Sequence, residues 1–187
     1  GVNLALTKFS DISVVDIKSG KILSGKKPSV DLNIHLTIYK NFKDINSIVH
    51  THSLYATSWA QSGRSIPCYG TTHADYYPKE IPITDLVNKK NSKKNYETEI
   101  GNTILKKLKK IKVKAANIPG VLALNHGVVA WGNTSKTAIE NAIAIEFIAQ
   151  LAFNSELINR SVKKLPNDLH KKHYDRKHGK NSYYGQK

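Results

Sequence analysis

The stretch Gly120-Val-Leu-Ala-Leu-Asn-His-Gly-Val-Val-Ala-Trp131 decides which fold we expect for this chain. Two apolar runs, 120–124 and 128–131, flank the tripeptide Asn125-His126-Gly127. Short apolar runs next to turn residues are typical of buried strands, so the stretch forms either two strands or one bent strand. In both cases a histidine lies beside a glycine, where another part of the backbone can approach closely.

A second strand is predicted at Ser47-Ile-Val-His50, and it leads into Thr51 and His52. Side chains at positions i and i+2 of a strand point to the same face, so His50 and His52 can reach one ion. Together with His126 they would supply three imidazoles and leave a fourth position open, as in catalytic zinc sites. The alternative is that these strand histidines are hydrogen-bonded separately and bind no metal.

Segments with helical periodicity surround the two strand regions. We expect helices at 31–42, 53–61, 97–110, 134–159 and 167–177, strand-like runs at 12–17, 21–23 and 66–69, and a loop-rich segment at 78–95. Asp31 and Ser53 stand where the N-caps of their helices belong. Strands alternating with packed helices, with hairpins among them, predict an α/β fold: a layered domain with a central mixed, largely antiparallel sheet flanked by helices.

Length and composition indicate an ordinary globular protein. The chain has 187 residues, of which 40% are apolar and 23% charged, which is the size of a single domain spanning 1–187. No apolar run approaches the roughly 20 residues of a membrane span, and no signal-peptide pattern opens the chain. The single cysteine, Cys68, excludes an internal disulfide framework, so we expect a cytoplasmic protein with no membrane partner.

The net charge of +15 raises the question of nucleic-acid binding. The excess is concentrated in three stretches, 88–95, 105–114 and 163–187. These stretches contain almost no interleaved aromatic residues, which single-stranded nucleic acids need for stacking. Solvated lysine faces are the favoured interpretation, attraction of a phosphate ligand is the second, and we expect no nucleic-acid partner. Of the other histidines, we expect most of His73, His170, His173 and His178 at the surface.

Five motifs of the sequence have a recognisable pattern. They are Ile48-Val-His-Thr-His-Ser53, Tyr69-Gly-Thr-Thr-His-Ala-Asp-Tyr76, Lys27-Pro-Ser29, Ile118-Pro-Gly-Val121 with Asn125-His-Gly127, and Lys172-His-Tyr174 with Tyr183-Tyr-Gly-Gln186. Together these motifs resemble the class II aldolase and adducin-head family, and in particular its L-ribulose-5-phosphate 4-epimerase branch. The resemblance covers the whole chain, and the Thr71-to-Asp75 motif separates this branch from the sugar-phosphate aldolases of the family.

The resemblance implies a divalent metal, usually Zn²⁺, with Mn²⁺ or Co²⁺ as other candidates. His50, His52 and His126 match its ligands, and Asp31 matches an acidic residue that can enter the metal's coordination shell when substrate is absent. A carboxylate is suited to this role because it can complete three imidazoles and exchange with a chelating substrate.

The same resemblance assigns roles to seven further residues. Asp75 and Tyr184 match the catalytic acid–base pair, although from the sequence alone Asp75 could cap a turn and Tyr184 could be a tail aromatic. Gly1 and Ser29 match phosphate-binding positions, and the supporting positions near the active site are Thr71, Glu97 and His173.

The implied activity is inversion at C4 of L-ribulose 5-phosphate to give D-xylulose 5-phosphate by retro-aldol and aldol steps. The resemblance also implies a homotetramer with active sites between neighbouring subunits. Two departures bear on this expectation: Val30 replaces a second phosphate-binding serine, and family members begin several dozen residues before Gly1, so the 1–187 domain is expected to be N-terminally incomplete. A sugar-phosphate aldolase and a truncated, non-catalytic metal-binding paralogue are the alternatives.

Overall fold

A three-stranded antiparallel sheet forms the centre of the computed structural model, which describes residues 6–180 and 182–183. The strand order is β3 (Ser47–Thr51), β5 (Gly127–Gly132) and β4 (Gly120–Ala123). In this register His50 is paired with Val129, and Leu122 is paired with Val128. The stretch at 120–131 is therefore two strands joined by a tight turn, with β5 in the middle of the sheet.

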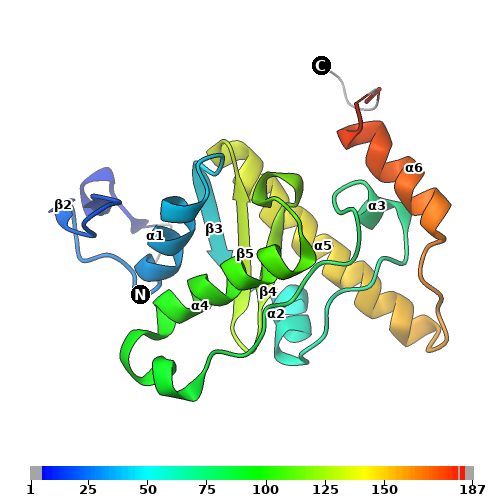
Figure 1. The fold of residues 1–187 in the computed structure, drawn as a ribbon, viewed down its shortest axis with the longest axis horizontal. Helices are drawn as coiled ribbons and strands as arrows, with labels where there is room; N and C mark the ends of the chain where they lie inside the picture. Colours follow the sequence, from blue (N-terminus) through cyan, green and yellow to red (C-terminus); the bar gives the residue numbers. More distant parts are fainter. Residues whose placement is uncertain (1–5, 181, 184–187) are drawn as a thin grey trace.

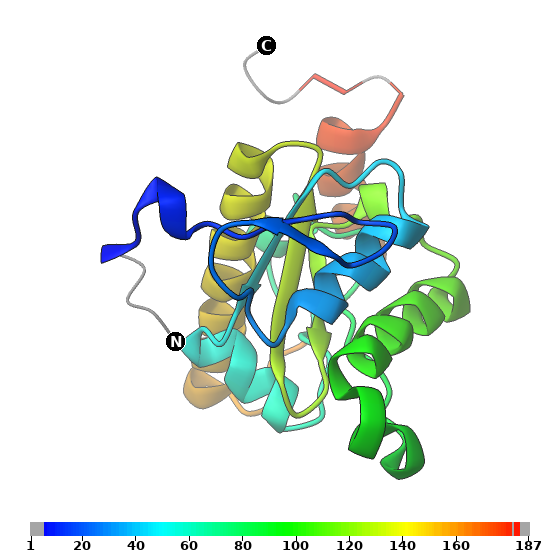
Figure 2. The same ribbon diagram turned by 90° about the vertical axis from the view of Figure 1, so that its left-hand side faces the viewer.

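Helices cover both faces of this sheet (Figures 1 and 2). On one face α2 (Leu54–Gln61) and α5 (Ser135–Ile158) pack against the strands. On the other face lie α1 (Leu32–Asn41) and α4 (Lys89–Ile111), which pack against each other. The predicted layered fold, with helices around a largely antiparallel sheet, is confirmed. Among the described residues, the one parallel contact is the isolated bridge between Ile83 and Leu122.

The hydrophobic core lies between these layers. The central strands are continuous apolar runs in the sequence because helices cover them on both faces. Every residue of β4 and β5 is buried, as expected for strands covered on both faces. The indole Nε1 of Trp131 donates a hydrogen bond to the carbonyl oxygen of Ala115 at 2.8 Å, so this large side chain is buried with its polar atom satisfied. Helix α5 begins where expected, because the Thr134 hydroxyl accepts from the Thr137 amide at 3.1 Å.

Smaller elements lie at the two ends of the molecule in Figure 1. The hairpin of β1 (Val14–Val15) and β2 (Ile22–Ser24) lies beyond α1, whereas α3 (Thr71–Ala74) and α6 (Asn167–His178) pack together at the opposite end. Two short 3₁₀ helices complete the described elements, Phe9–Asp11 and Ala115–Asn117.

Two predicted segments differ from the structure. The run 66–69 contributes only an isolated bridge between Ile66 and Ile81, not a strand of the sheet. The segment expected as a loop up to residue 95 is helical from Lys89, with a kink at Asn95 where φ is −146° and ψ is 55°. The helical part was missed because Lys89–Asn95 is polar throughout and carries none of the apolar periodicity on which a helix prediction depends.

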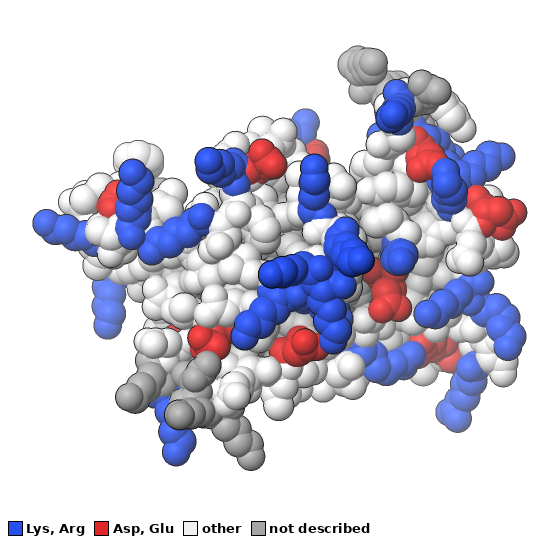
Figure 3. All heavy atoms as spheres, viewed as in Figure 1, with Lys and Arg blue, Asp and Glu red and all other residues white. Residues whose placement is uncertain are grey.

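Basic side chains gather over the face of the molecule that carries α4 and α6 (Figure 3). They include Lys107, Lys110, Lys164 and Lys171, which line a cavity of about 1050 Å³ between the two helices. Lys164 and Lys171 are paired with carboxylates, Glu80 and Asp175 respectively, which fits the prediction of solvated lysine faces. Within the described part of the chain, no helix is long and apolar enough to cross a membrane.

Candidate metal centre

The two histidines of the His-Thr-His motif come from the end of β3. His50 lies within the strand, and His52 follows the last paired residue, Thr51. The Nδ1 atom of His50 lies 2.8 Å from the carbonyl oxygen of Val128 on β5. A carbonyl can only accept, so Nδ1 carries the proton and Nε2 of His50 is left with a free lone pair. The neighbouring strand thus holds this imidazole in the form that binds a metal.

The third histidine comes from the turn between β4 and β5. Asn125 has a positive φ of 59°, a conformation that asparagine tolerates better than most residues, and it directs His126 back toward β3. Gly127 is required for this approach. A Cβ atom at Gly127 would lie 2.7 Å from the carbonyl oxygen of Thr51 and 2.8 Å from Cδ2 of His52, closer than real Cβ contacts.

The three imidazoles converge on one point. Nε2 of His50 lies 3.2 Å from Nε2 of His52 and 3.1 Å from Nε2 of His126, and all three ligand atoms lie within 4.8 Å of one another. The His50 and His126 rings are stacked, with His52 edge-on to both. Burial lowers the pKa of His126, and positive charge on His50 and His52 would lower it further. Three imidazoles arranged in this way fit a divalent ion and leave a coordination position open.

Three other predicted residues lie around this cluster. Asp31, at the start of α1, has Oδ1 3.9 Å from Nε2 of His126. Its second oxygen, Oδ2, accepts a hydrogen bond at 3.3 Å from the hydroxyl of Ser29, which in turn accepts from the Asp31 amide at 3.2 Å. The carboxylates of Asp31 and Glu97 both oppose the lowering of the His126 pKa, so each is close enough for its charge to act on the cluster.

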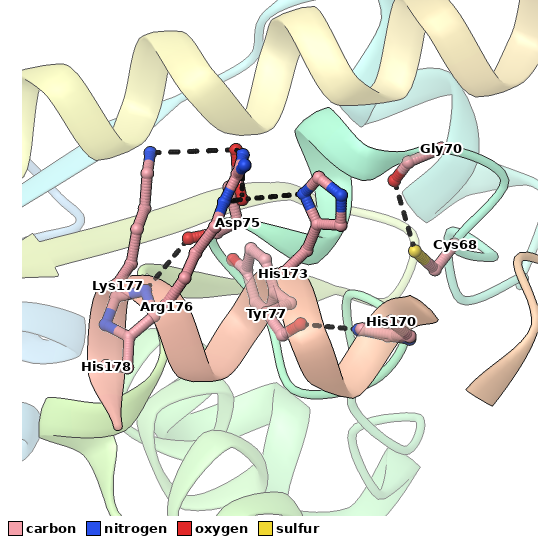
Figure 4. Close-up of polar contacts among 9 residues, drawn as sticks. All are labelled: Cys68, Gly70, Asp75, Tyr77, His170, His173, Arg176, Lys177 and His178. Carbon is pink, nitrogen blue, oxygen red and sulfur yellow. Dashed lines mark hydrogen bonds and ion pairs between the residues drawn. The ribbon is translucent and has the colours of Figure 1, made fainter. Parts of the chain in front are cut away.

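A different group forms around Asp75 at the end of α3 (Figure 4). Its carboxylate accepts from Nη2 of Arg176 at 2.8 and 2.9 Å and from Nε of Arg176 at 3.1 Å. Nδ1 of His173 lies 3.3 Å from the same carboxylate, and Nζ of Lys177 lies 3.9 Å away. Thr71 begins α3, the helix that Asp75 ends. Asp75 and His173 are thus in direct contact, held by a bidentate arginine that the sequence motifs did not single out.

The structure places the two groups at opposite ends of the sheet. The histidine cluster lies at the Gly127 end of β5, whereas Asp75 lines a cavity of about 420 Å³ together with Trp131 and Gly132, at the other end of that strand. At about 3.3 Å per residue, β5 separates the two ends by about 16 Å. Within one chain, Asp75 and His173 are therefore not part of the metal centre.

Two histidines expected at the surface are buried, which corrects that prediction. His73 is 4% exposed, and its Nε2 lies 3.0 Å from the carbonyl oxygen of Lys79; burial lowers its pKa to about 4. His170 is 9% exposed, and its Nε2 lies 2.7 Å from the carbonyl oxygen of Tyr77. Their burial depends on how α3 and α6 pack together, which the local sequence around each histidine does not reveal.

Sequence reasoning also missed His35 on α1, half-buried near the cluster, where burial and the charge of His50 lower its pKa. The sequence pointed to this residue only in that His35 stands between two apolar residues, Ile34 and Leu36, in a predicted helix. Two predicted site residues, Gly1 and Tyr184, lie outside the described residues.

Comparison with known sequences identifies the class of protein. Residues 1–153 match the family model described as the class II aldolase and adducin N-terminal domain, and the chain belongs to this family.

Among curated relatives, the chain is similar to the L-ribulose-5-phosphate 4-epimerase UlaF of Salmonella paratyphi B, with 39% identity over 188 aligned positions that cover all of this chain and 81% of the relative. The UlaF protein of Salmonella typhi matches with the same identity and coverage.

Solved structures show the same fold at low sequence identity. An L-fuculose 1-phosphate aldolase superposes with a TM-score of 0.77 and 22% identity, covering 94% of this chain and 76% of that one. YgbL from Escherichia coli, described as a putative aldolase/epimerase/decarboxylase, superposes with a TM-score of 0.65 and 21% identity, covering 87% and 73%.

Proposed function

We propose that this protein is a metal-dependent epimerase that interconverts L-ribulose 5-phosphate and D-xylulose 5-phosphate by cleaving and reforming the C3–C4 bond. The observation that carries the proposal is the convergence of three Nε2 atoms, from His50, His52 and His126, beside the Asp31 carboxylate. The choice of substrate rests on the similarity to relatives named as L-ribulose-5-phosphate 4-epimerases, which covers all of this chain and 81% of those relatives.

Inversion at C4 needs bond cleavage because the proton on that carbon is not acidic. A divalent ion held by the three histidines, which we propose to be Zn²⁺, would supply Lewis-acid stabilisation of the charge left on the ketone fragment. Asp31 is suited to enter and leave the coordination shell, because its Oδ1 lies 3.9 Å from Nε2 of His126 and can therefore reach an ion held by that imidazole.

The other fragment is an aldehyde, which must rotate so that the ketone fragment attacks its opposite face. Two groups must then exchange a proton with its oxygen, one for each stereochemical direction, and we assign these roles to Asp75 and Tyr184. Ser29 and Gly1 are proposed to hold the phosphate so that the fragment stays bound while it rotates. Thr71, Glu97 and His173 are proposed as supporting residues.

The separation of the two groups leads us to propose a homo-oligomer, a tetramer by analogy with the family. Within one chain, the length of β5, about 16 Å, lies between the histidine cluster and the cavity that Asp75 lines, so we infer that the two groups of one chain do not act on the same sugar. A second copy could bring its Asp75 to the metal of the first. Helix α5 offers an apolar surface for such contacts, because Ile139, Ile143 and Phe147, spaced by four residues, are 52%, 65% and 50% exposed.

The decisive experiment supplies the metal-loaded protein with L-ribulose 5-phosphate and follows formation of D-xylulose 5-phosphate. Epimerisation that disappears with chelator and returns with Zn²⁺ supports the proposal. Release of free glycolaldehyde phosphate without C4 inversion would instead identify an aldolase. Metal binding with neither product would identify a non-catalytic protein. We also propose a cytoplasmic location, which agrees with the single, buried and unpaired Cys68.

A further inference from the structure

A carboxylate on α5 contacts the chain immediately after the metal-binding motif. The Oε2 atom of Glu146 accepts from the hydroxyl of Ser53 at 2.7 Å and from the amide of Ala56 at 2.9 Å. Its Oε1 atom accepts from the amide of Tyr55 at 2.8 Å. Among the side chains that the structure describes, no cation lies within ion-pair distance of Glu146, and the amides at the start of α2 are the groups that offset its charge.

This arrangement changes the role of Ser53. The sequence predicts Ser53 as an N-cap, and it does occupy that position, but its side chain accepts no hydrogen bond from its own helix. The hydroxyl instead donates to Glu146, which is 93 residues further along the chain. The first turn of α2 is therefore capped from α5, which packs on the same face of the sheet.

The two histidines of the motif differ in how they are held. The ring of His50 is fixed by its bond to the carbonyl oxygen of Val128, and its backbone is paired within the sheet. His52 lies beyond the last ladder pair, that of Thr51 with Val128. In the part of the chain that the structure describes, the only polar partner of the His52 ring is the Nε2 atom of His50. Besides its edge-on contacts with the rings of His50 and His126, the His52 ring is therefore positioned through its own backbone, and the next residue is the one that Glu146 holds.

We propose that Glu146 is a positioning residue of the metal centre. By holding Ser53 and the first turn of α2, it determines where His52 presents Nε2 and thereby sets the affinity of the three-histidine site for zinc. The inference rests on the metal site proposed above. It adds to that site a residue of α5, a helix that contributes none of the metal ligands. Residues that orient metal ligands in this indirect way typically change metal affinity by about 10- to 100-fold when they are substituted.

The test measures zinc affinity by competition with a chromophoric chelator, using the whole protein. Glu146→Gln keeps the length of the side chain but places an NH₂ group against one of its three donors, and Ser53→Ala removes a single contact. Thr134→Ala is the matched control, because it removes a side-chain cap of α5 far from the histidines. We expect an affinity loss of about 10- to 100-fold for Glu146→Gln, a smaller loss for Ser53→Ala and no change for Thr134→Ala.

Unfolding with and without zinc separates positioning from simple stability. A 10- to 100-fold loss of affinity reduces the stabilisation conferred by excess zinc by about 1.4 to 2.8 kcal/mol. A cap that only stabilises α2 would lower the unfolding midpoint equally with and without zinc. Wild-type zinc affinity in Glu146→Gln, or an equal loss in Thr134→Ala, would refute the inference while leaving the metal site intact.

Two further outcomes complete the design. Absence of zinc binding in the wild-type protein would refute the metal site and the inference together. If Glu146→Gln does not fold, Ser53→Ala decides, and its unchanged affinity would count against the inference.

Discussion

The absence of a side chain at Gly127 allows the imidazoles of His50 and His52 to meet at the end of β5. We predict that Gly127→Ala weakens zinc binding by at least about tenfold, because the added methyl group would lie 2.8 Å from Cδ2 of His52 and 3.2 Å from Cε1 of His50. Metal titration followed by elemental analysis would measure the loss.

Gly70→Ala is the control for this substitution, since a Cβ atom at Gly70 meets nothing within 4 Å. Unchanged zinc affinity in the Gly70 variant, together with weaker binding in the Gly127 variant, would attribute the effect to crowding around Gly127, where the added methyl group meets the two rings and the carbonyl oxygen of Thr51. Equal affinities in both variants would show that the rings can move aside without cost.

Asp75 and Tyr184 are predicted to be needed for proton transfer and not for metal binding. Asp75→Asn and Tyr184→Phe should each lower epimerisation by about 10²- to 10⁴-fold, the usual scale for loss of a general acid or base. Each variant should retain its metal, because neither residue is assigned as a ligand. Kinetics with both epimers and metal analysis in parallel would measure the two effects.

The contrasting variant is His50→Asn combined with His52→Asn, which should lose activity because it loses the metal. Wild-type rates in Tyr184→Phe, or loss of metal in Asp75→Asn, would remove that residue from the proposed pair.

At the scale of elements, α3 depends on a buried, neutral histidine. The pKa of His73 is lowered to about 4 in the folded chain, from an ordinary value of 6.5, because the ring is buried. Between these values the unfolded chain binds a proton at His73 that the folded chain does not. The free energy of unfolding should therefore fall as the pH drops from about 6.5 to 4, by up to about 1.4 kcal/mol per pH unit from this residue.

His73→Gln should remove this contribution, because glutamine can still donate to the carbonyl oxygen of Lys79 but does not titrate. Urea unfolding at several pH values between 7.5 and 4.5 would give the free energy of unfolding of both proteins and show how steeply it falls with pH. Near pH 7 the free energy of unfolding should change with pH equally in the variant and the wild-type protein, which provides the internal control. Parallel curves down to pH 4.5 would show that His73 titrates normally.

The elements with strong apolar patterns were predictable from the sequence, and those formed by polar contacts were not. The strands of 120–131 and helix α5 follow from hydrophobic periodicity and turn residues. The helical start of α4 lacks that pattern, and the capping of α2 by Glu146 depends on a residue that is distant in sequence. The convergence of His50 and His52 follows from strand geometry, whereas the separation of Asp75 from them requires knowledge of how α3 and α6 pack.

At the scale of the whole molecule, the division of the predicted residues into two groups gives a test by subunit mixing. Asp75→Asn and the His50→Asn, His52→Asn double variant should each be inactive alone. After the two proteins are unfolded, mixed and refolded together, some sites should combine an intact histidine cluster from one chain with an intact Asp75 from its neighbour. Activity should therefore return in part, and sedimentation analysis would report the assembly state.

Mixing the same two variants without unfolding provides the control, because intact assemblies should exchange subunits slowly if the apolar face of α5 is buried between them. No recovery after joint refolding, in assemblies of wild-type size, would mean that each site is built from a single chain.

The lysine-rich surface over α4 and α6 has a kinetic consequence. A sugar phosphate carries between one and two negative charges at neutral pH, and this protein carries a net charge of +15. Long-range attraction of this kind increases the frequency of productive diffusional encounters at low ionic strength and is screened within about 10 Å at 0.1 M salt. The kcat/KM for the sugar phosphate should therefore fall as sodium chloride is added, with little change in kcat. The outward-facing lysines, which contribute neither core packing nor catalysis, would then govern how fast the enzyme finds its substrate.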